Sequence, residues 1–251
     1  MWFGLITLFP EMRAAFEVGV TGRALRDGKI SLATFNPRDF TKDKHQTVDH
    51  HPYGGGPGMV MMAEPLLSAI AAAKAAAPNP AKVIYLSPQG QQFNQAAAET
   101  FAATPHSYIF IAGRYEGIDE RVIESVVDEE WSIGDYILTG GELAAYVMMD
   151  AITRLIPGVV GDSDSIDQDS LTSGLLKYPQ YTRPENLNGL NVPDILLSGH
   201  HGNIERWRLK ASLGKTWSRR PDLLAKKCLT SEEVGLLNEF IANFSQKKLE
   251  N

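Results

Sequence analysis

The stretch WSIGDYILTGGE, residues 131–142, decides how this chain is interpreted. Apolar residues alternate there with glycines, immediately before a segment with a helical pattern. Glycine lacks a Cβ and tolerates positive φ, so these positions let backbone N–H and C=O groups come close to a ligand. The stretch therefore predicts a ligand-binding loop between a β-strand and a helix that starts near Glu142.

Strand-like and helix-like segments alternate from the start of the chain to about Gly158. The predicted strands are Trp2–Phe9, Ile30–Phe35, Val83–Leu86, Tyr108–Ala112 and Trp131–Ile133. The predicted helices are Glu11–Val18, Glu64–Ala77, Asn94–Ala103, Ile118–Val127 and Glu142–Leu155. This alternation predicts an α/β fold with a parallel sheet and helices on its faces.

The pattern changes after Gly158. Residues 161–170 form an acidic, serine-rich run with the composition of a mobile linker or lid, and no β-rich run follows it. Two helices are predicted beyond it, at Asn203–Trp217 and Ser231–Phe244. We therefore expect an α/β domain over residues 1–160, a lid over 161–173 and a small, mainly helical domain over 174–251.

Charge divides the chain at the same place. The net charge of the whole chain is −6, yet residues 1–173 carry −10 and residues 174–251 carry +4. A run of Arg and Lys between 203 and 227 also contains Trp207 and Trp217. Clustered positive charge with aromatic rings suits a phosphate backbone and exposed bases. A solvated helix face whose tryptophans belong to the core explains the composition equally well.

Composition excludes several classes of protein. The 251 residues, 43% of them hydrophobic, suffice for one large core or two modest ones. No apolar run of about 18 residues and no signal peptide occurs, so we expect a cytoplasmic protein without membrane contact. Cys228 is the only cysteine, which rules out a disulfide within one chain, and the six histidines show no metal-site spacing.

Four glycine-rich or polar motifs lie where strands of such a sheet would end: Tyr53–Met59, Leu86–Gly90, Ala112–Gly117 and Trp131–Glu142. The first lacks the lysine and hydroxyl residue of a phosphate loop, so we interpret it as a tight turn packed beside something important. Ligands of open α/β sheets bind outside the carboxyl ends of the strands. The other three motifs are therefore expected to line one pocket.

These residues resemble the bacterial tRNA (guanine-N1)-methyltransferases of TrmD type, in the SPOUT superfamily. The resemblance covers nearly the whole chain in the order of the family. It is carried by Ile6–Pro10, Asn36–Phe40, Gly54–Met62, Leu86–Gly90, Gly113–Asp119, Trp131–Glu142, Gln168–Leu176, Tyr181–Pro184 and Ser198–His201.

The resemblance implies a fold and an activity. It implies that loops 86–90, 113–117 and 133–141 form a deep trefoil knot, which general rules of topology would not predict. It implies a homodimer with active sites between its subunits, and S-adenosylmethionine held bent within the knot. The substrate it implies is the tRNA anticodon stem-loop, methylated on N1 of the guanosine directly 3′ of the anticodon.

The expected donor site is lined by main-chain groups and a few apolar side chains, which suits an adenosine ligand. The pocket glycines would be equally consistent with a structural role. The residues expected to bind the donor are Leu86, Ser87, Gly113, Glu116, Ile133, Gly134, Asp135, Tyr136, Ile137, Leu138, Gly140 and Gly141.

Methylation of guanine N1 requires a base, because that nitrogen keeps its proton at neutral pH. By resemblance, Asp169 is the base and Arg154 steadies the guanine while negative charge builds toward O6. Each has an alternative role: Asp169 would cap the segment that follows it, and Arg154 would pair with Asp150 one helical turn away.

The chain departs from the family pattern at four positions. Lys177 replaces a usual acidic residue, Ser173 a usual aspartate, Ala144 a usual proline and Ala112 a usual cysteine. Lys177 leaves Asp169 as the only nearby proton acceptor, contacts a phosphate, or signals altered activity. Two other functions therefore remain open: a tRNA-binding protein without catalysis, and a knotted enzyme that methylates ribose 2′-oxygen. Some family members are stimulated by Mg²⁺, although no tightly held metal is expected here.

Overall fold

The computed structural model describes residues 1–104, 106–161 and 169–249. It divides into two compact units, Met1–Gly161 and Asp162–Asn251, and each is described by itself. Residues 162–168 of the expected lid lie outside the described residues.

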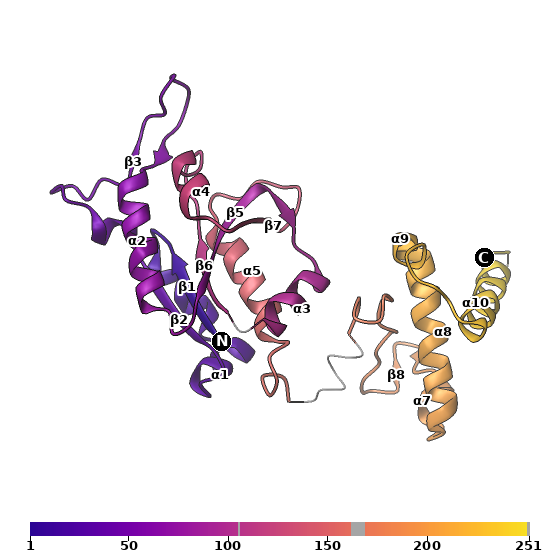
Figure 1. The fold of residues 1–251 in the computed structure, drawn as a ribbon. Coiled ribbons are helices and arrows are strands. Elements are labelled where there is room, and N and C mark those ends of the chain that lie inside the picture. The colour runs from indigo at the N-terminus through magenta and orange to yellow at the C-terminus, as the bar shows by residue number, and fades with distance from the viewer. Residues whose placement is uncertain (105, 162–168, 250–251) are drawn as a thin grey trace. The chain divides into compact units, whose positions relative to one another are not determined.

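The first unit is built on a parallel sheet of five strands in the order β2-β1-β6-β5-β7 (Figure 1). These are β1 (Trp2–Ile6), β2 (Ser31–Phe35), β5 (Ala81–Gln92), β6 (Ser107–Ile111) and β7 (Glu129–Ser132). The β2–β1, β1–β6 and β6–β5 pairs have no register shift, with Phe3 opposite Tyr108 in the centre of the sheet. The predicted parallel α/β architecture is confirmed.

Helices cover both faces of this sheet (Figure 1). Helices α2 (Ala63–Ala76) and α4 (Glu120–Val126) pack on one face. Helices α1 (Gly19–Arg26), α3 (Gln95–Ala103) and α5 (Glu142–Thr153) pack on the other, together with the 3-10 helix η1 (Pro10–Phe16). Alternate residues of the central strands enter the two cores, as in β6, where Tyr108 and Phe110 face one core and Ile109 and Ile111 the other.

The amino-terminal boundaries differ from those predicted. Strand β1 ends at Ile6 rather than Phe9, because the Thr7 hydroxyl accepts a hydrogen bond from the Phe9 N–H (3.0 Å) and turns the chain. The helix predicted over Glu11–Val18 is the shorter η1. Helix α1, which was not predicted because of its glycines, follows directly, and a Cβ at Gly22 would lie 2.0 Å from the carbonyl oxygen of Glu17.

The glycine-dense motif Tyr53–Met59 does not follow a strand of the main sheet, as the sequence analysis expected. It joins β3 (Asp49–His50) to β4 (Val60–Met61) in an antiparallel hairpin, and η2 (Pro37–Phe40) precedes it. Its loop extends away from the sheet (Figure 1). Gly54, Gly55, Gly56 and Gly58 all have positive φ, which only glycine adopts at low cost.

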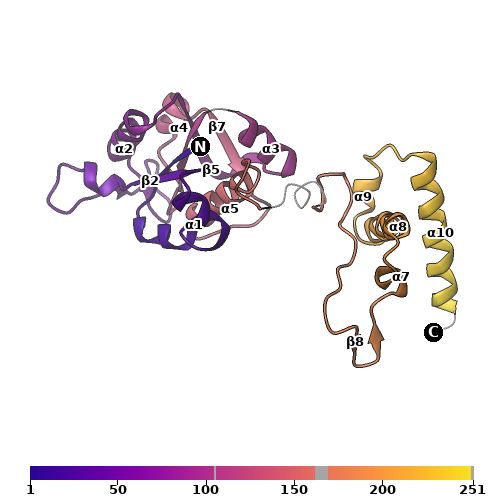
Figure 2. The same ribbon diagram turned by 90° about the horizontal axis from the view of Figure 1, so that it is seen from below.

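The second unit is mainly helical, as expected. Helices α8 (His201–Arg219) and α10 (Ser231–Leu249) lie side by side, with the short α7 (Asp194–Leu197) and α9 (Pro221–Leu224) near them (Figure 2). Its core contains Leu175, Leu213 and Leu236. The sequence analysis missed a hairpin, β8 (Asn186–Leu187) and β9 (Leu190–Asn191), because two-residue strands leave no alternation to read.

Helix α8 carries much of the basic run. Arg206 and Lys210 both pair with Glu239 of α10, at 2.6 and 3.0 Å. The two tryptophans of α8 are half-buried, and Trp217 packs edge-on against Phe244 (5.8 Å between ring centroids). Part of this charge and of the aromatic surface is therefore used within the unit.

Gly214 should set the spacing of α8 and α10. A Cβ there would lie 2.3 Å from the ring of Phe240, so Gly214→Ala should lower the free energy of unfolding by about 1–3 kcal/mol through overpacking. The matched control is Gly235→Ala on α10, where a Cβ meets nothing within 4 Å and helix propensity should raise stability by up to about 1 kcal/mol. Urea unfolding followed by circular dichroism measures both, and equal effects would contradict close packing at Gly214.

Candidate functional site

A pocket of about 430 Å³ opens at the carboxyl ends of β6, β5 and β7, three neighbouring parallel strands. Its walls are residues 85–89 of β5, the loop 113–117 after β6, and most of residues 131–141 at the end of β7 and beyond. Ala144 of α5 also lines it. The structure thus brings together the three motifs that the sequence analysis expected to meet.

The first wall is a bulge within β5 rather than a loop after the strand. Pairing with β7 breaks between Leu86 and Gln91, both of which lie opposite Trp131. Residues 87–90 are therefore pushed out of the ladder toward the pocket. A Cβ at Gly90 would lie 2.3 Å from the Trp131 backbone nitrogen, so the bulge requires glycine there.

The second and third walls touch through glycines. The Gly141 N–H donates a hydrogen bond to the Gly113 carbonyl (2.9 Å), and a Cβ at Gly141 would lie 2.8 Å from the Cα of Ala112. Tyr85 packs beneath Gly113, where a Cβ would meet its ring at 3.0 Å. Burial raises the pKa of Tyr85, and the charge of Glu130 raises it further, so its hydroxyl remains a donor at neutral pH.

A buried ion pair joins these walls to the sheet. Arg114 Nη2 lies 2.8 Å from Oε2 of Glu142, whose side chain is only 1% exposed. Glu142 also accepts a hydrogen bond from the Thr7 hydroxyl (2.9 Å). Arg114 donates to the Thr139 carbonyl (3.1 Å), and its guanidinium stacks over the ring of Phe9. One arginine thus ties the end of β1, two pocket loops and the first turn of α5.

The loop after β7 forms the outer rim. Gly134 has φ of +150°, and the Ser132 hydroxyl lies 3.2 Å from its backbone nitrogen. The Tyr136 hydroxyl donates to the Ile133 carbonyl (3.3 Å), which folds the loop back on itself. Tyr136 and Ile137 remain 54% and 81% exposed, so this rim presents apolar surface to its surroundings.

The glycine-dense hairpin supports the second wall. Glu116 donates its N–H to the Met59 carbonyl (2.9 Å), and Met61 donates to the Gly117 carbonyl (2.9 Å). A Cβ at Gly58 would lie 2.5 Å from the side chain of Glu116. The motif therefore packs against loop 113–117, and the importance of that loop stays a prediction.

Most of the residues expected to bind a donor line this one pocket: Leu86, Ser87, Gly113, Glu116, Ile133, Gly134, Tyr136, Ile137, Leu138, Gly140 and Gly141. Asp135 is not among the lining residues, and its side chain is exposed. The lining residues that were not predicted are Tyr85, Pro88, Gln89, Arg114, Tyr115, Gly117, Trp131, Ser132, Thr139 and Ala144. All of them lie within the quoted motifs or at most two residues from one, so proximity to those motifs was the available signal.

The two expected catalytic residues lie in different units. Arg154 caps the carboxyl end of α5 and is half-buried. Asp169 is the first residue of the described range 169–249, and its side chain is 25% exposed. Lys177 lies beside it, with Nζ 3.5 Å from Oδ1 of Asp169, and the Lys177 N–H donates to the Ser170 hydroxyl (2.9 Å). The most conspicuous departure from the family pattern therefore contacts the expected base.

Asp169 and Lys177 line a second, smaller pocket of about 230 Å³ within the carboxyl-terminal unit. Glu205 and Arg208 of α8 line it too and form an ion pair (2.7 Å). The guanidinium of Arg208 lies over the ring of Tyr178, 4.9 Å from its centroid. This wall offers a carboxylate, cations and an aromatic face close together.

The sequence of this chain is similar to those of known proteins. A sequence profile described as tRNA (Guanine-1)-methyltransferase, TrmD, matches residues 1–226. The chain belongs to the tRNA (guanine-N1)-methyltransferase family. It is 61% identical to the tRNA (guanine-N(1)-)-methyltransferase of Aeromonas hydrophila over 242 residues, 96% of this chain and 97% of that protein.

Two other members of the family are similarly close. The tRNA (guanine-N(1)-)-methyltransferase of Pseudoalteromonas atlantica is 60% identical over 95% of this chain and 90% of its own length. That of Methylococcus capsulatus is 59% identical over 99% of both chains. Members of this family are enzymes, so the pocket and the basic segment 174–251 belong to a methyltransferase.

No group of three or more His, Cys, Asp or Glu side chains within residues 1–104, 106–161 and 169–249 is placed to hold a metal ion. In the same ranges, no helix combines the length and apolar character needed to cross a membrane.

Removal of the negative charge of Glu142 should destabilise the segments that form the pocket. Glu142→Gln leaves Arg114 without its charged partner in a buried site, which should cost about 3–5 kcal/mol of unfolding free energy. Glu17→Gln makes the same chemical change in the exposed Arg13–Glu17 pair, whose side chains are 41% and 48% exposed, and should cost less than about 0.5 kcal/mol. Urea unfolding measures both, and a Glu142→Gln cost as small as the Glu17→Gln cost would contradict the role of the pair.

Proposed function

We propose that this enzyme transfers a methyl group from S-adenosylmethionine to N1 of the guanosine directly 3′ of the anticodon in tRNA. The observation that carries the proposal is the convergence of three loops on one pocket, in a chain of the tRNA (guanine-N1)-methyltransferase family. The proposal assigns the donor to that pocket, the base to Asp169 and the stabilisation of the guanine to Arg154.

The chemistry of the pocket supports a bound adenosine moiety. Its volume of about 430 Å³ falls in the range of small-molecule sites. Ile133 and Leu138 offer apolar surface to a base, and the glycines at 113, 134 and 140 leave main-chain groups open to read its polar edge. Tyr85 and Ser87 add hydroxyl groups within the same wall.

We also propose that the loops form the knot implied by the resemblance. Strand β7 pairs with β5 at the edge of the sheet, yet Gly141 hydrogen-bonds to Gly113 after β6, on the other side of β5. The segment 133–141 therefore crosses the end of β5, and close backbone contact at Gly141 draws it tight against the neighbouring loop. A crossing of this kind supports a threaded chain.

Proton removal from N1 falls to Asp169 in this proposal. Glu205, the other carboxylate lining the pocket beside it, lies 2.7 Å from Arg208, whereas Asp169 lies 3.5 Å from Lys177. The assignment of Asp169 follows the resemblance, and Lys177 takes the place of the second acid that the resemblance implies. The guanidinium of Arg154 would offset the negative charge that builds toward O6 in the transition state.

The basic segment 174–251 provides the surface for tRNA. Residues 174–251 carry a net charge of +4, while the rest of the chain is acidic. Arg208 stacks on Tyr178 beside Asp169, and Tyr181 packs near Trp207 (6.4 Å between ring centroids). Cations and aromatic faces suit a phosphate backbone and unstacked bases. Substrate binding and proton removal would thus share one wall.

A homodimer completes the proposal. Leu143 and Val147 of α5 are 54% and 49% exposed and lie one helical turn apart on the same face. Ile137 and Tyr136 add exposed apolar surface at the pocket rim, just before α5. Arg154, at the carboxyl end of α5, follows Leu143 by eleven residues and therefore lies on the same helix face as Leu143 and Val147. A second copy packed on this face would cover the apolar surface and lie next to Arg154.

Asp169→Asn should abolish most of the methyl transfer. Loss of a general base typically lowers the rate by about 10²–10⁴. The measurement is incorporation from labelled S-adenosylmethionine into unmodified tRNA, followed by nucleoside analysis. The matched control is Asp194→Asn, an exposed position in the same unit, which should keep the wild-type rate.

The nucleoside product separates the alternatives. Labelled N1-methylguanosine that disappears in Asp169→Asn supports the proposal. A 2′-O-methylated nucleoside would indicate the ribose methyltransferase, and tight tRNA binding without incorporation would indicate a binding protein. Wild-type activity in Asp169→Asn would contradict the assignment of the base.

Val147→Glu should convert the dimer to a monomer. A charge placed within an apolar isologous interface is introduced twice by symmetry, and each copy loses solvation. Sedimentation equilibrium at micromolar concentration checks the mass, with Val234→Glu as control because Val234 is 43% exposed on α10 of the other unit. A monomeric wild-type protein, or a dimeric Val147→Glu variant, would contradict this interface.

A further inference from the structure

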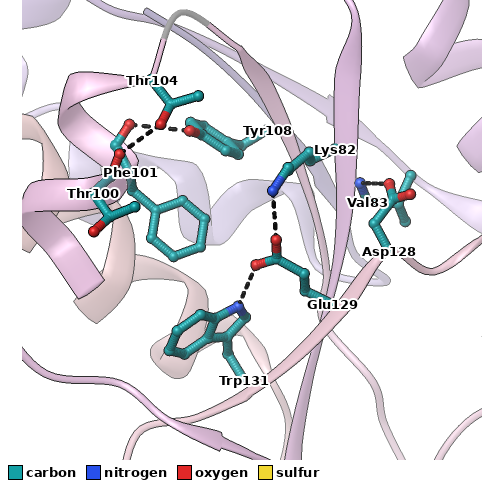
Figure 3. Close-up of polar contacts among 9 residues, drawn as sticks. All are labelled: Lys82, Val83, Thr100, Phe101, Thr104, Tyr108, Asp128, Glu129 and Trp131. Atoms are coloured by element: carbon teal, nitrogen blue, oxygen red, sulfur yellow. Dashed lines mark hydrogen bonds and ion pairs between the residues drawn. The ribbon is translucent and has the colours of Figure 1, made fainter.

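A charged cluster lies on the edge of the sheet, outside the proposed donor and base residues (Figure 3). Lys82 Nζ lies 2.5 Å from Oε1 of Glu129, and the indole N–H of Trp131 donates to Oε2 of the same carboxylate (2.8 Å). Glu129 therefore uses both oxygens to join β5 to the indole of β7. Lys82 and Glu129 do not line the proposed donor pocket, whereas Trp131 does.

The strand geometry brings these groups together. Glu129 and Trp131 are two residues apart on β7 and so project from the same face of the strand. Lys82 lies on the paired strand β5, two residues before Ile84, which is opposite Glu129. Burial opposes the charge of Glu129, but the hydrogen bonds from Lys82 and Trp131 outweigh it and leave the pKa of Glu129 below its usual value. The carboxylate is thus ionised at neutral pH.

Trp131 occupies the junction of two pocket walls. Both Leu86 and Gln91 lie opposite it, so the bulge of residues 87–90 opens at this position. Gly90 packs against its backbone nitrogen, and the loop 133–141 begins two residues later. The indole itself is held from the far side by the ring of Phe101, 5.4 Å between centroids.

We infer that Lys82 and Glu129 are positioning residues for the donor pocket, acting through Trp131. The Glu129 carboxylate fixes the position of the Trp131 indole. The position of Trp131 in turn determines where the bulge of β5 leaves the ladder and where loop 133–141 starts. Displacement of either wall by a fraction of an ångström disturbs a site built from main-chain groups, because such groups cannot adjust by a rotamer change. The identity of the ligand, but not the positioning itself, rests on the proposed function.

The first test needs no ligand. Hydrogen–deuterium exchange of the full chain is compared for the wild type, Glu129→Ala and Trp131→Phe. Each substitution removes the hydrogen bond between the Trp131 indole and the Glu129 carboxylate. Local opening of segments 87–90 and 133–141 should then become more frequent, and their amide exchange should rise about tenfold. Glu129→Gln keeps one acceptor oxygen but loses the charge that pairs with Lys82, so exchange should rise less than in Glu129→Ala.

The second test uses S-adenosylhomocysteine as probe, with its Kd measured by calorimetry. Glu129→Ala and Trp131→Phe should each weaken binding about tenfold, and the double variant should weaken it no further, since both remove one interaction. Thr104→Val is the matched control: its hydroxyl donates to the Thr100 carbonyl (2.7 Å) beside the same cluster (Figure 3), but it does not touch Trp131.

The outcomes separate the two proposals. Unchanged exchange in both segments in Glu129→Ala, or equal effects in Thr104→Val, would overturn the positioning role. Absence of wild-type binding to the probe would instead overturn the donor assignment, while raised exchange in Glu129→Ala would still support positioning. Additive losses in the double variant would show that Glu129 and Trp131 act separately and would also overturn the inference.

Discussion

The buried ion pair between Arg114 and Glu142 is the constraint on which the pocket depends. A carboxylate that is 1% exposed is tolerated when its charge is paired, and here Arg114 pairs with it while the Thr7 hydroxyl donates a hydrogen bond to Oε1. Because Arg114 lies on one pocket loop and Glu142 begins α5, the need to pair this charge fixes both segments. The loop 133–141 is held between them, with its Thr139 carbonyl on the same arginine.

Close backbone approach is the second constraint, and it explains the glycines. Gly90 and Gly141 lie against backbone atoms of Trp131 and Ala112, where a side chain would not fit. The pocket walls are therefore main chain packed on main chain, stiffened by one ion pair within and one charged cluster at the edge. Such walls present fixed N–H and C=O groups, which suits a ligand recognised by the polar edge of a base.

Sequence patterns were sufficient for the parts of the fold that repeat. The alternation of strand-like and helix-like segments predicted the parallel α/β unit, and glycine-rich motifs located the pocket loops. Pairings between distant residues carried no such signal: Arg114 and Glu142 are 28 residues apart, and either would be expected on the surface by type. The bulge in β5 was missed because it interrupts a strand rather than ending one. Asp135 was assigned to the pocket from its neighbours, yet its side chain is exposed.

The expected base was located by family resemblance alone, because a single aspartate in an acidic run has no distinguishing pattern. Its contact with Lys177, eight residues later, was likewise not predictable from composition. The basic character of residues 174–251 was evident from charge counting, but pairs such as Arg206–Glu239 show that part of that charge serves the fold of the unit. A count of all charged residues is thus a weaker guide to a binding surface than a count that leaves out the residues paired with each other within the unit.

The most direct test of the central claim is a crystal structure of the chain with S-adenosylhomocysteine. The adenosine moiety should lie in the pocket between residues 85–89, 113–117 and 133–141, with its base contacting main-chain groups and the Arg114–Glu142 pair intact behind it. Ligand bound elsewhere, or a bound state in which that ion pair is broken and the two loops have separated, would contradict the account.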